Sequence, residues 1–178
     1  MPWKNGGGRT REIAVYLPGA GMDDFLWRVS VAEICEAGSF SLFPGIERQL
    51  LLLDGSGVVL ELPEGCHRLL KPYQALRFAG EAPVRCAPLN GRCHALNVMT
   101  RRGGAVAELK VSYGAHLIAD TGILRMFFVA RGAYRCGGKD GMLFELHQGD
   151  AVLIAGRELV FSGQGDPDAV LIEVEFRL

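Results

Sequence analysis

The feature that most constrains the fold is the regular alternation of short apolar segments with turns rich in glycine and proline. The apolar stretches 49–53 and 58–62, for example, are separated by the glycine turn 54–57, which predicts a β-hairpin. No amphipathic helix longer than about three turns can be recognised. Many short strands joined by glycine turns are typical of antiparallel sandwiches and barrels. The sequence therefore predicts an all-β protein.

The second half of the chain repeats the first in outline. The stretch that begins at Arg48 has a counterpart that begins at Arg125, and each continues through a glycine turn into another apolar segment. The turns within 52–57 and 146–154 resemble those that connect the strands of a cupin. We therefore expect a bicupin, that is, two double-stranded β-helix (jelly-roll) barrels in one compact chain. The predicted halves are 1–102 and 103–178, with exchange of strands between them left open.

Two predicted strands carry polar side chains at alternate positions. In 27–32, Arg28 and Ser30 alternate with apolar residues, which gives this strand one apolar and one polar face. A later strand carries Asn97 and ends near Arg101. In a barrel, such a polar face points either into solvent or into the interior.

The first residues, which include Gly6-Gly7-Gly8, are unusually rich in glycine. A phosphate-binding loop would place its lysine after the glycines and at the start of a helix, whereas Lys4 precedes them and an extended segment follows. A flexible tail is the second possibility. Because Trp3 is a large apolar anchor and 12–17 reads as a strand, we expect this segment to enter the fold at once.

Composition limits the classes of partner. The 178 residues are 49% hydrophobic, with 19 basic and 20 acidic side chains, so no net charge draws the chain to nucleic acid or to a membrane surface. No apolar run is long enough for a membrane span, and no signal peptide is recognised, so we expect a soluble cytoplasmic protein. Its expected oligomeric state is a monomer or a homodimer. The five cysteines show no C-x-x-C spacing and are expected to be buried free thiols.

Several phrases of the sequence together carry a resemblance to a known family. They are Trp3-Lys4-Asn5-Gly6-Gly7-Gly8, Trp27-Arg28-Val29-Ser30, the segment 38–45 with Arg48, and Asn97-Val98-Met99-Thr100-Arg101-Arg102. Over essentially its whole length the chain resembles the HutD/Ves family. The resemblance implies a bicupin fold and an association with bacterial histidine utilisation. It also implies a regulatory or ligand-binding role, with urocanate or a formylated glutamate derivative as ligand.

The histidines do not follow the pattern of a metal-dependent cupin enzyme, which uses closely spaced imidazoles and a carboxylate. The chain has no H-x-H motif, and its four histidines are scattered: His67, His94, His116 and His147. We therefore expect neither a metal nor another cofactor. A metal site assembled by the fold from distant residues is left open.

The arginines suit a different chemistry, because guanidinium groups are forked, permanently charged donors for a carboxylate. If the polar faces point inward, Arg28 and Arg48 hold the carboxylate, Asn97 orients the ligand, and Trp3 closes the mouth together with the two residues that follow it. The predicted ligand-binding residues are Trp3, Lys4, Asn5, Glu12, Arg28, Ser30, Arg48, Asn97 and Arg101. The predicted function is binding of a small carboxylated metabolite by a sensor or regulator of histidine degradation, with no catalytic residue.

Two other classes of function stay open. One is a cupin-type isomerase or hydrolase that acts on a related metabolite, with Glu12 or Lys4 as acid or base and arginines that stabilise an oxyanion. The other is a purely structural or protein-interaction barrel, whose arginines would face solvent.

Overall fold

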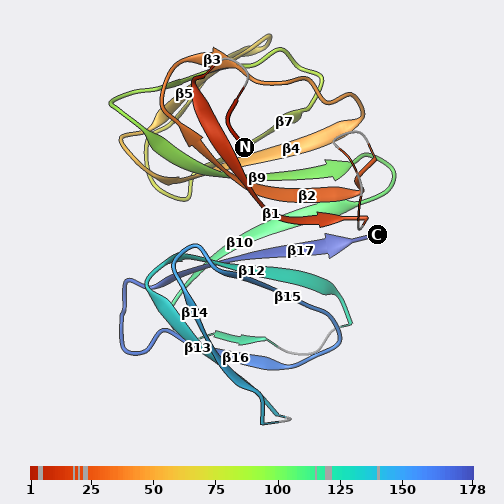
Figure 1. Cartoon of the computed structure of the whole chain (residues 1–178), viewed down its shortest axis with the longest axis vertical. Helices are drawn as coiled ribbons and strands as arrows, with labels where there is room; N and C mark the ends of the chain where they lie inside the picture. The colour runs from red at the N-terminus through yellow and green to blue at the C-terminus, as the bar shows by residue number, and fades with distance from the viewer. Residues whose placement is uncertain are drawn as a thin grey trace. The chain divides into compact units, whose positions relative to one another are not determined.

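The fold is all-β, as the sequence predicts. The computed structural model describes residues 1–3, 6–17, 19, 21, 24–114, 116–118, 122–139 and 141–178. The strands are β1 (Gly8–Tyr16), β2 (Trp27–Ile34), β3 (Gly38–Ser39), β4 (Ile46–Asp54), β5 (Val58–Leu62), β6 (Gly65–Leu69), β7 (Ala75–Ala79), β8 (Arg85–Pro88), β9 (Cys93–Arg101), β10 (Val106–Tyr113), β11 (His116–Ile118), β12 (Leu124–Arg131), β13 (Ala133–Gly138), β14 (Leu143–His147), β15 (Ala151–Ile154), β16 (Leu159–Ser162) and β17 (Val170–Arg177) (Figure 1). In this described part, no helix is long and apolar enough to cross a membrane.

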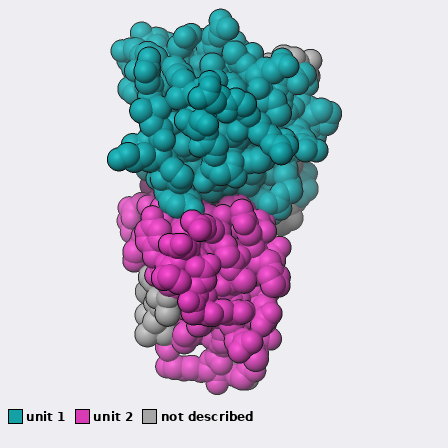
Figure 2. Space-filling view, turned by 90° about the vertical axis from the view of Figure 1, so that its left-hand side faces the viewer, with its two compact units in different colours: residues 1–105 teal, residues 106–178 magenta. Residues whose placement is uncertain are grey.

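The chain divides into two compact units, which Figure 2 shows in separate colours. Unit 1 comprises Met1–Ala105 and unit 2 comprises Val106–Leu178. Unit 1 contains a five-stranded sheet of order β1-β2-β9-β4-β7 and a four-stranded sheet of order β3-β8-β5-β6. Unit 2 contains two four-stranded sheets, of order β10-β17-β12-β15 and β11-β16-β13-β14.

The two units repeat one strand order. Strands β2 to β9 of unit 1 correspond in sequence to β10 to β17 of unit 2, and β1 is an additional edge strand. The register of the central pair also repeats, because β4 shifts against β9 between Leu52 and Asp54, and β12 shifts against β17 between Val129 and Arg131. The internal repeat predicted from the sequence is therefore confirmed. Among the described pairings, the two sheets of each unit remain separate rather than joined into a closed barrel.

The core of unit 1 lies between its two sheets, and it corrects one prediction. Leu50 and Leu52 of β4 and Val58 and Leu60 of β5 are fully buried in the same apolar cluster. However, β4 pairs with β7 and β9, whereas β5 pairs with β6 and β8. The predicted hairpin of 49–53 with 58–62 is thus wrong. The turn 54–57 carries the chain from one sheet to the facing one, because both apolar segments then bury their side chains in one core.

Aromatic rings fill the core of unit 2. Phe127 and Phe161 pack with their ring centroids 4.7 Å apart, and Tyr134 meets Phe161 edge-on. All three side chains are fully buried. Since Phe127 lies on β12, this cluster identifies the face of β12 that points into unit 2.

The cysteines are all free, and their burial predicts their reactivity. Cys86, Cys93 and Cys136 are buried as expected from the sequence, but Cys35 and Cys66 are exposed. Burial raises the pKa of Cys86 to about 12 and the pKa of Cys93 and Cys136 to about 11, so these three remain protonated at pH 8. Iodoacetamide at pH 8 should therefore modify two cysteines of the native protein and all five in denaturant, as counted by mass spectrometry. A third adduct formed before unfolding would contradict the described burial.

Candidate anion-binding site

The large sheet of unit 1 brings polar side chains from three neighbouring strands onto one face. Ser30 of β2 is paired with Asn97 of β9, and both Arg28 of β2 and Arg48 of β4 are paired with Met99 of β9. Residues that are paired across a sheet, or are two apart along a strand, share a face. The register therefore places the two arginines, the serine and the asparagine together.

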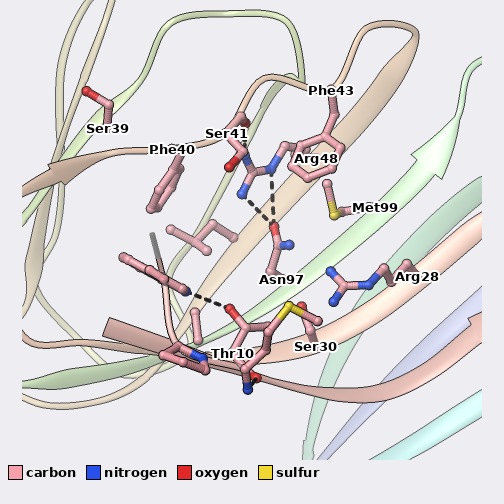
Figure 3. A pocket seen from close by; sticks show the side chains of 15 residues that line it. Thr10, Arg28, Ser30, Ser39, Phe40, Ser41, Phe43, Arg48, Asn97 and Met99 are labelled. Atoms are coloured by element: carbon pink, nitrogen blue, oxygen red, sulfur yellow. Dashed lines mark hydrogen bonds between the residues drawn. The ribbon is translucent and has the colours of Figure 1, made fainter. Parts of the chain in front are cut away.

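These side chains line a cavity of about 490 Å³ in unit 1. Figure 3 shows Asn97 between the two guanidinium groups, with Ser30 below it and the ring of Phe40 on the opposite side. The lining residues are Met1, Pro2, Trp3, Thr10, Arg28, Ser30, Ala32, Ser39, Phe40, Ser41, Phe43, Arg48, Leu50, Asn97 and Met99.

Arg48 is a buried cation whose described hydrogen bonds go only to neutral partners. Its side chain donates from Nε and Nη2 to Asn97 Oδ1, at 3.4 and 3.3 Å, and from Nη1 to the Ser41 carbonyl oxygen at 3.4 Å. Three phenylalanine rings surround its guanidinium carbon at centroid distances of 4.8 to 5.6 Å: Phe40, Phe43 and Phe78. Burial lowers the pKa of Arg48 to about 10, and the positive charge of Arg28 acts in the same direction. Arg48 is therefore charged at neutral pH but poorly solvated.

Among the described residues, Arg28 has one carboxylate partner. Its Nε donates to Glu12 Oε2 of β1 at 2.7 Å, and the Glu12 side chain is 47% exposed whereas that of Arg28 is 6% exposed. Glu12 holds the guanidinium from the solvent side, since β1 is the edge strand beside β2. In Figure 3, the two terminal nitrogens of Arg28 point toward the space beside Ser30 and Asn97.

Ser30 adds a further unsatisfied group to the same space. The residue is 1% exposed, and its Oγ has no hydrogen-bond partner among the described residues. A buried hydroxyl without a partner costs about 1–3 kcal/mol, which makes it a donor that a bound ligand could satisfy.

The residues before β1 form one rim of the cavity. Trp3 donates from its backbone nitrogen to the Gly8 carbonyl oxygen at 2.9 Å and from Nε1 to Thr10 Oγ1 at 2.8 Å. Its ring meets Phe40 edge-on at a centroid distance of 6.1 Å. Gly6 allows the chain to fold back onto β1, because its φ of 73° is one that glycine adopts without strain.

The structure gathers most, but not all, of the predicted site residues. Those in the cavity lining are Trp3, Arg28, Ser30, Arg48 and Asn97. Glu12 is not in the cavity lining, but it is paired with Ser30 across β1 and β2 and accepts a hydrogen bond from Arg28. Arg101 does not line the cavity, and its Nε donates instead to the Phe25 carbonyl oxygen at 3.1 Å. Lys4 and Asn5 lie outside the described residues.

The sequence reasoning missed the apolar and hydroxyl part of the lining. Met99 could have been found, because it lies two residues after Asn97 and therefore shares its face. Phe40 and Phe43 belong to a turn-rich segment, where no periodicity indicates direction. Thr10 of β1 lines the cavity beside Ala32 of β2, with which it is paired.

The described residues contain no group of three or more His, Cys, Asp or Glu side chains that could hold a metal ion. Among the described residues, His94 Nδ1 lies 2.8 Å from Asp54 Oδ1, on the exposed surface. The cavity offers guanidinium, amide and hydroxyl groups instead, which suit an anionic organic ligand.

The fold of the chain is similar to that of known cupin domain proteins. Over the whole chain it is similar to a cupin 2 conserved barrel domain protein from Leptotrichia buccalis, with a TM-score of 0.63, 8% identity and 92% of that chain covered. A likeness at this identity concerns the fold alone, and it identifies a cupin-like β fold.

The chain belongs to the HutD family, whose model matches residues 1–171. It is 39% identical over 140 residues to protein Ves of Citrobacter koseri, which covers 77% of this chain and 71% of that relative. Among solved structures, it is similar over its whole length to a conserved protein of unknown function from Pseudomonas aeruginosa PAO1, with 28% identity, a TM-score of 0.90 and 93% of that chain covered. HutD from Pseudomonas fluorescens SBW25, described for a formate condition, is 30% identical, with a TM-score of 0.81 and 94% of that chain covered. These findings confirm the resemblance drawn from the motifs.

Proposed function

We propose that this protein is a bicupin that binds a small carboxylated metabolite in the cavity of unit 1, as a sensor or regulator of histidine degradation. Each unit would then be a double-stranded β-helix barrel, which the repeated strand order supports. The single observation that carries the proposal is that two buried arginines share one cavity and have, among the residues that the structure describes, one carboxylate partner, the half-exposed Glu12.

The charge balance of the cavity supports an anionic ligand. Arg28 and Arg48 are 5% and 6% exposed, and Arg48 hydrogen-bonds to an amide and a carbonyl rather than to a carboxylate. A buried charge without a counter-ion is costly, and the positive charge of Arg28 disfavours the charged form of Arg48. A ligand carboxylate between them would offset both effects and would receive forked, charge-assisted hydrogen bonds.

The remaining walls support a small carbon skeleton beside the carboxylate. Phe40, Phe43 and Met99 supply apolar surface, and Ser30 supplies a hydroxyl that lacks a partner. Urocanate and formylglutamate combine a carboxylate with a small, partly planar body, and both fit histidine utilisation, the association implied by the family resemblance. The five free cysteines support action in the reducing cytoplasm.

Calorimetry with matched ligands tests the proposal. We expect urocanate or formylglutamate to bind with a stoichiometry of one per chain. The fully methyl-esterified form of the bound compound, which has no free carboxylate, should bind at least about 100-fold more weakly, because a buried charge pair contributes several kcal/mol. The comparison isolates the carboxylate, since the ester keeps the carbon skeleton. Absence of binding by both acids to folded protein, or equal affinity for acid and ester, would contradict the proposal.

A further inference from the structure

The repeated register allows residue-by-residue comparison of the two units. Leu52 of β4 and Val129 of β12 both immediately precede the register shift, so they are equivalent. Four residues earlier, Arg48 is equivalent to Arg125. On the partner strands, Asn97 of β9 is equivalent to Glu173 of β17, because they pair with the equivalent residues Leu50 and Phe127.

The neighbouring backbone confirms this equivalence. In unit 1 the Leu52 nitrogen donates to the Gln74 carbonyl oxygen, and the Tyr73 nitrogen donates to the Leu52 carbonyl oxygen. In unit 2 Val129 makes the same two bonds, to Asp150 and from Gly149. Tyr73 and Gly149 also share a positive φ, of 69° and 90°. The two arginines therefore occupy the same place in the two copies.

The partners of the two arginines differ in charge. Arg48 meets the neutral amide of Asn97, whereas Arg125 Nε lies 3.1 Å from Glu173 Oε1 and 3.6 Å from Glu175 Oε2. The Arg125 and Glu173 side chains are each 12% exposed. Glu175 takes the place of Met99, since each pairs with the arginine of its own unit. The site in unit 2 thus contains the negative charge that the cavity in unit 1 lacks.

We propose that Arg125 of unit 2 is the counterpart of Arg48 with its anion built in, so that Glu173 occupies the role that a ligand carboxylate has in unit 1. The counterpart covers this arginine alone, because Glu108 and Lys110 stand where unit 1 has Arg28 and Ser30. This inference rests on the proposed function of unit 1. Native protein then binds one small carboxylate per chain. Replacing Glu173 and Glu175 by their unit 1 equivalents opens a second carboxylate site at Arg125.

The opened site would be specific for small carboxylates for a physical reason. The double change Glu173→Asn and Glu175→Met removes both negative charges beside Arg125 and shortens residue 173 by one methylene. The guanidinium, which is 12% exposed, then loses the two carboxylates beside its Nε, and an anion as small as formate could take their place in a charge-assisted pair.

The test is a formate titration of protein labelled with ¹⁵N-arginine, observed by NMR at the Nε–H resonances of Arg48 and Arg125. In the unsubstituted protein we expect a saturable shift at Arg48 and none at Arg125. In Glu173→Asn/Glu175→Met we expect both to shift, with affinities within about tenfold of each other. The matched control is Glu145→Asn, which removes the partner of Arg135 at the same 3.1 Å distance but on the exposed surface, and which should create no saturable site.

The outcomes separate this inference from the proposed function. A folded double variant whose Arg125 does not respond, or an Arg125 that already responds in the unsubstituted protein, overturns the inference. No response at Arg48 in the unsubstituted protein overturns the proposed function instead. If the double variant does not fold, Asn97→Glu tests the inference instead. A built-in carboxylate in unit 1 should abolish the response of Arg48 to formate. A response of Arg48 that persists in this variant would overturn the inference.

Discussion

Replacement of Arg48 by methionine is expected to weaken binding of the carboxylate ligand at least about 100-fold, which corresponds to about 2.7 kcal/mol. The guanidinium would contact the ligand charge in a cavity wall where Phe40, Phe43 and Phe78 exclude water. The same change should leave the free energy of unfolding equal or raise it by about 1 kcal/mol, because an apolar side chain of similar length replaces a buried cation. A loss of affinity without a loss of stability is the signature of a binding residue.

The measurement pairs calorimetry with urea denaturation, and Arg101→Met is the matched control. Arg101 lies on β9 of the same sheet and also contacts an aromatic ring, that of Phe25 at 5.9 Å, but it does not line the cavity. Its replacement should leave the affinity unchanged. The assignment of Arg48 fails if both variants bind alike, or if Arg48→Met loses affinity only in proportion to a loss of folded protein.

Much of the fold could be predicted because strand periodicity and turn residues are local signals. The alternation around Arg28 and Ser30 indicated a strand with a polar face, and the correspondence of Arg48 with Arg125 indicated the duplication. The turn 54–57 could not be interpreted correctly, because a glycine turn inside a hairpin and one between facing sheets have the same composition. Only the pairing partners of β4 and β5, which are distant in sequence, distinguish the two.

The residues of the candidate site could be predicted only within strands, where side chains alternate between the two faces. Asn97 and Arg48 could be placed beside Arg28 once an inward face was assumed, but the sequence does not state which face is inward. Trp27 and Val29, on the other face of β2, are also buried, so burial alone would not have shown which face of β2 lines the cavity. Phe40 and Phe43 lie in an irregular segment and Arg101 at the end of a strand, where periodicity gives no direction.

Gly8→Ala is the substitution expected to damage both stability and binding. A Cβ at this position would lie 2.2 Å from the Glu33 carbonyl oxygen and 3.2 Å from the Trp3 ring. The carbonyl belongs to the paired strand β2 and cannot move without separating β1 from it. We expect the free energy of unfolding to fall by about 3 kcal/mol and, because Trp3 is displaced from the rim, carboxylate affinity to fall about tenfold.

Two further variants show which part of the site the added methyl group disturbs. Gly21→Ala is the control, because its Cβ would meet no atom of the described residues within 4 Å, and it should match the unsubstituted protein in urea denaturation and calorimetry. The double variant Gly8→Ala/Trp3→Ala should bind no more weakly than Trp3→Ala alone, since the methyl group acts on affinity through the indole ring. Additive losses of affinity would instead mean that Gly8 supports the cavity through β1 and Glu12. If Gly8→Ala keeps the stability and the affinity of the unsubstituted protein, the glycine-rich segment does not contribute to the site.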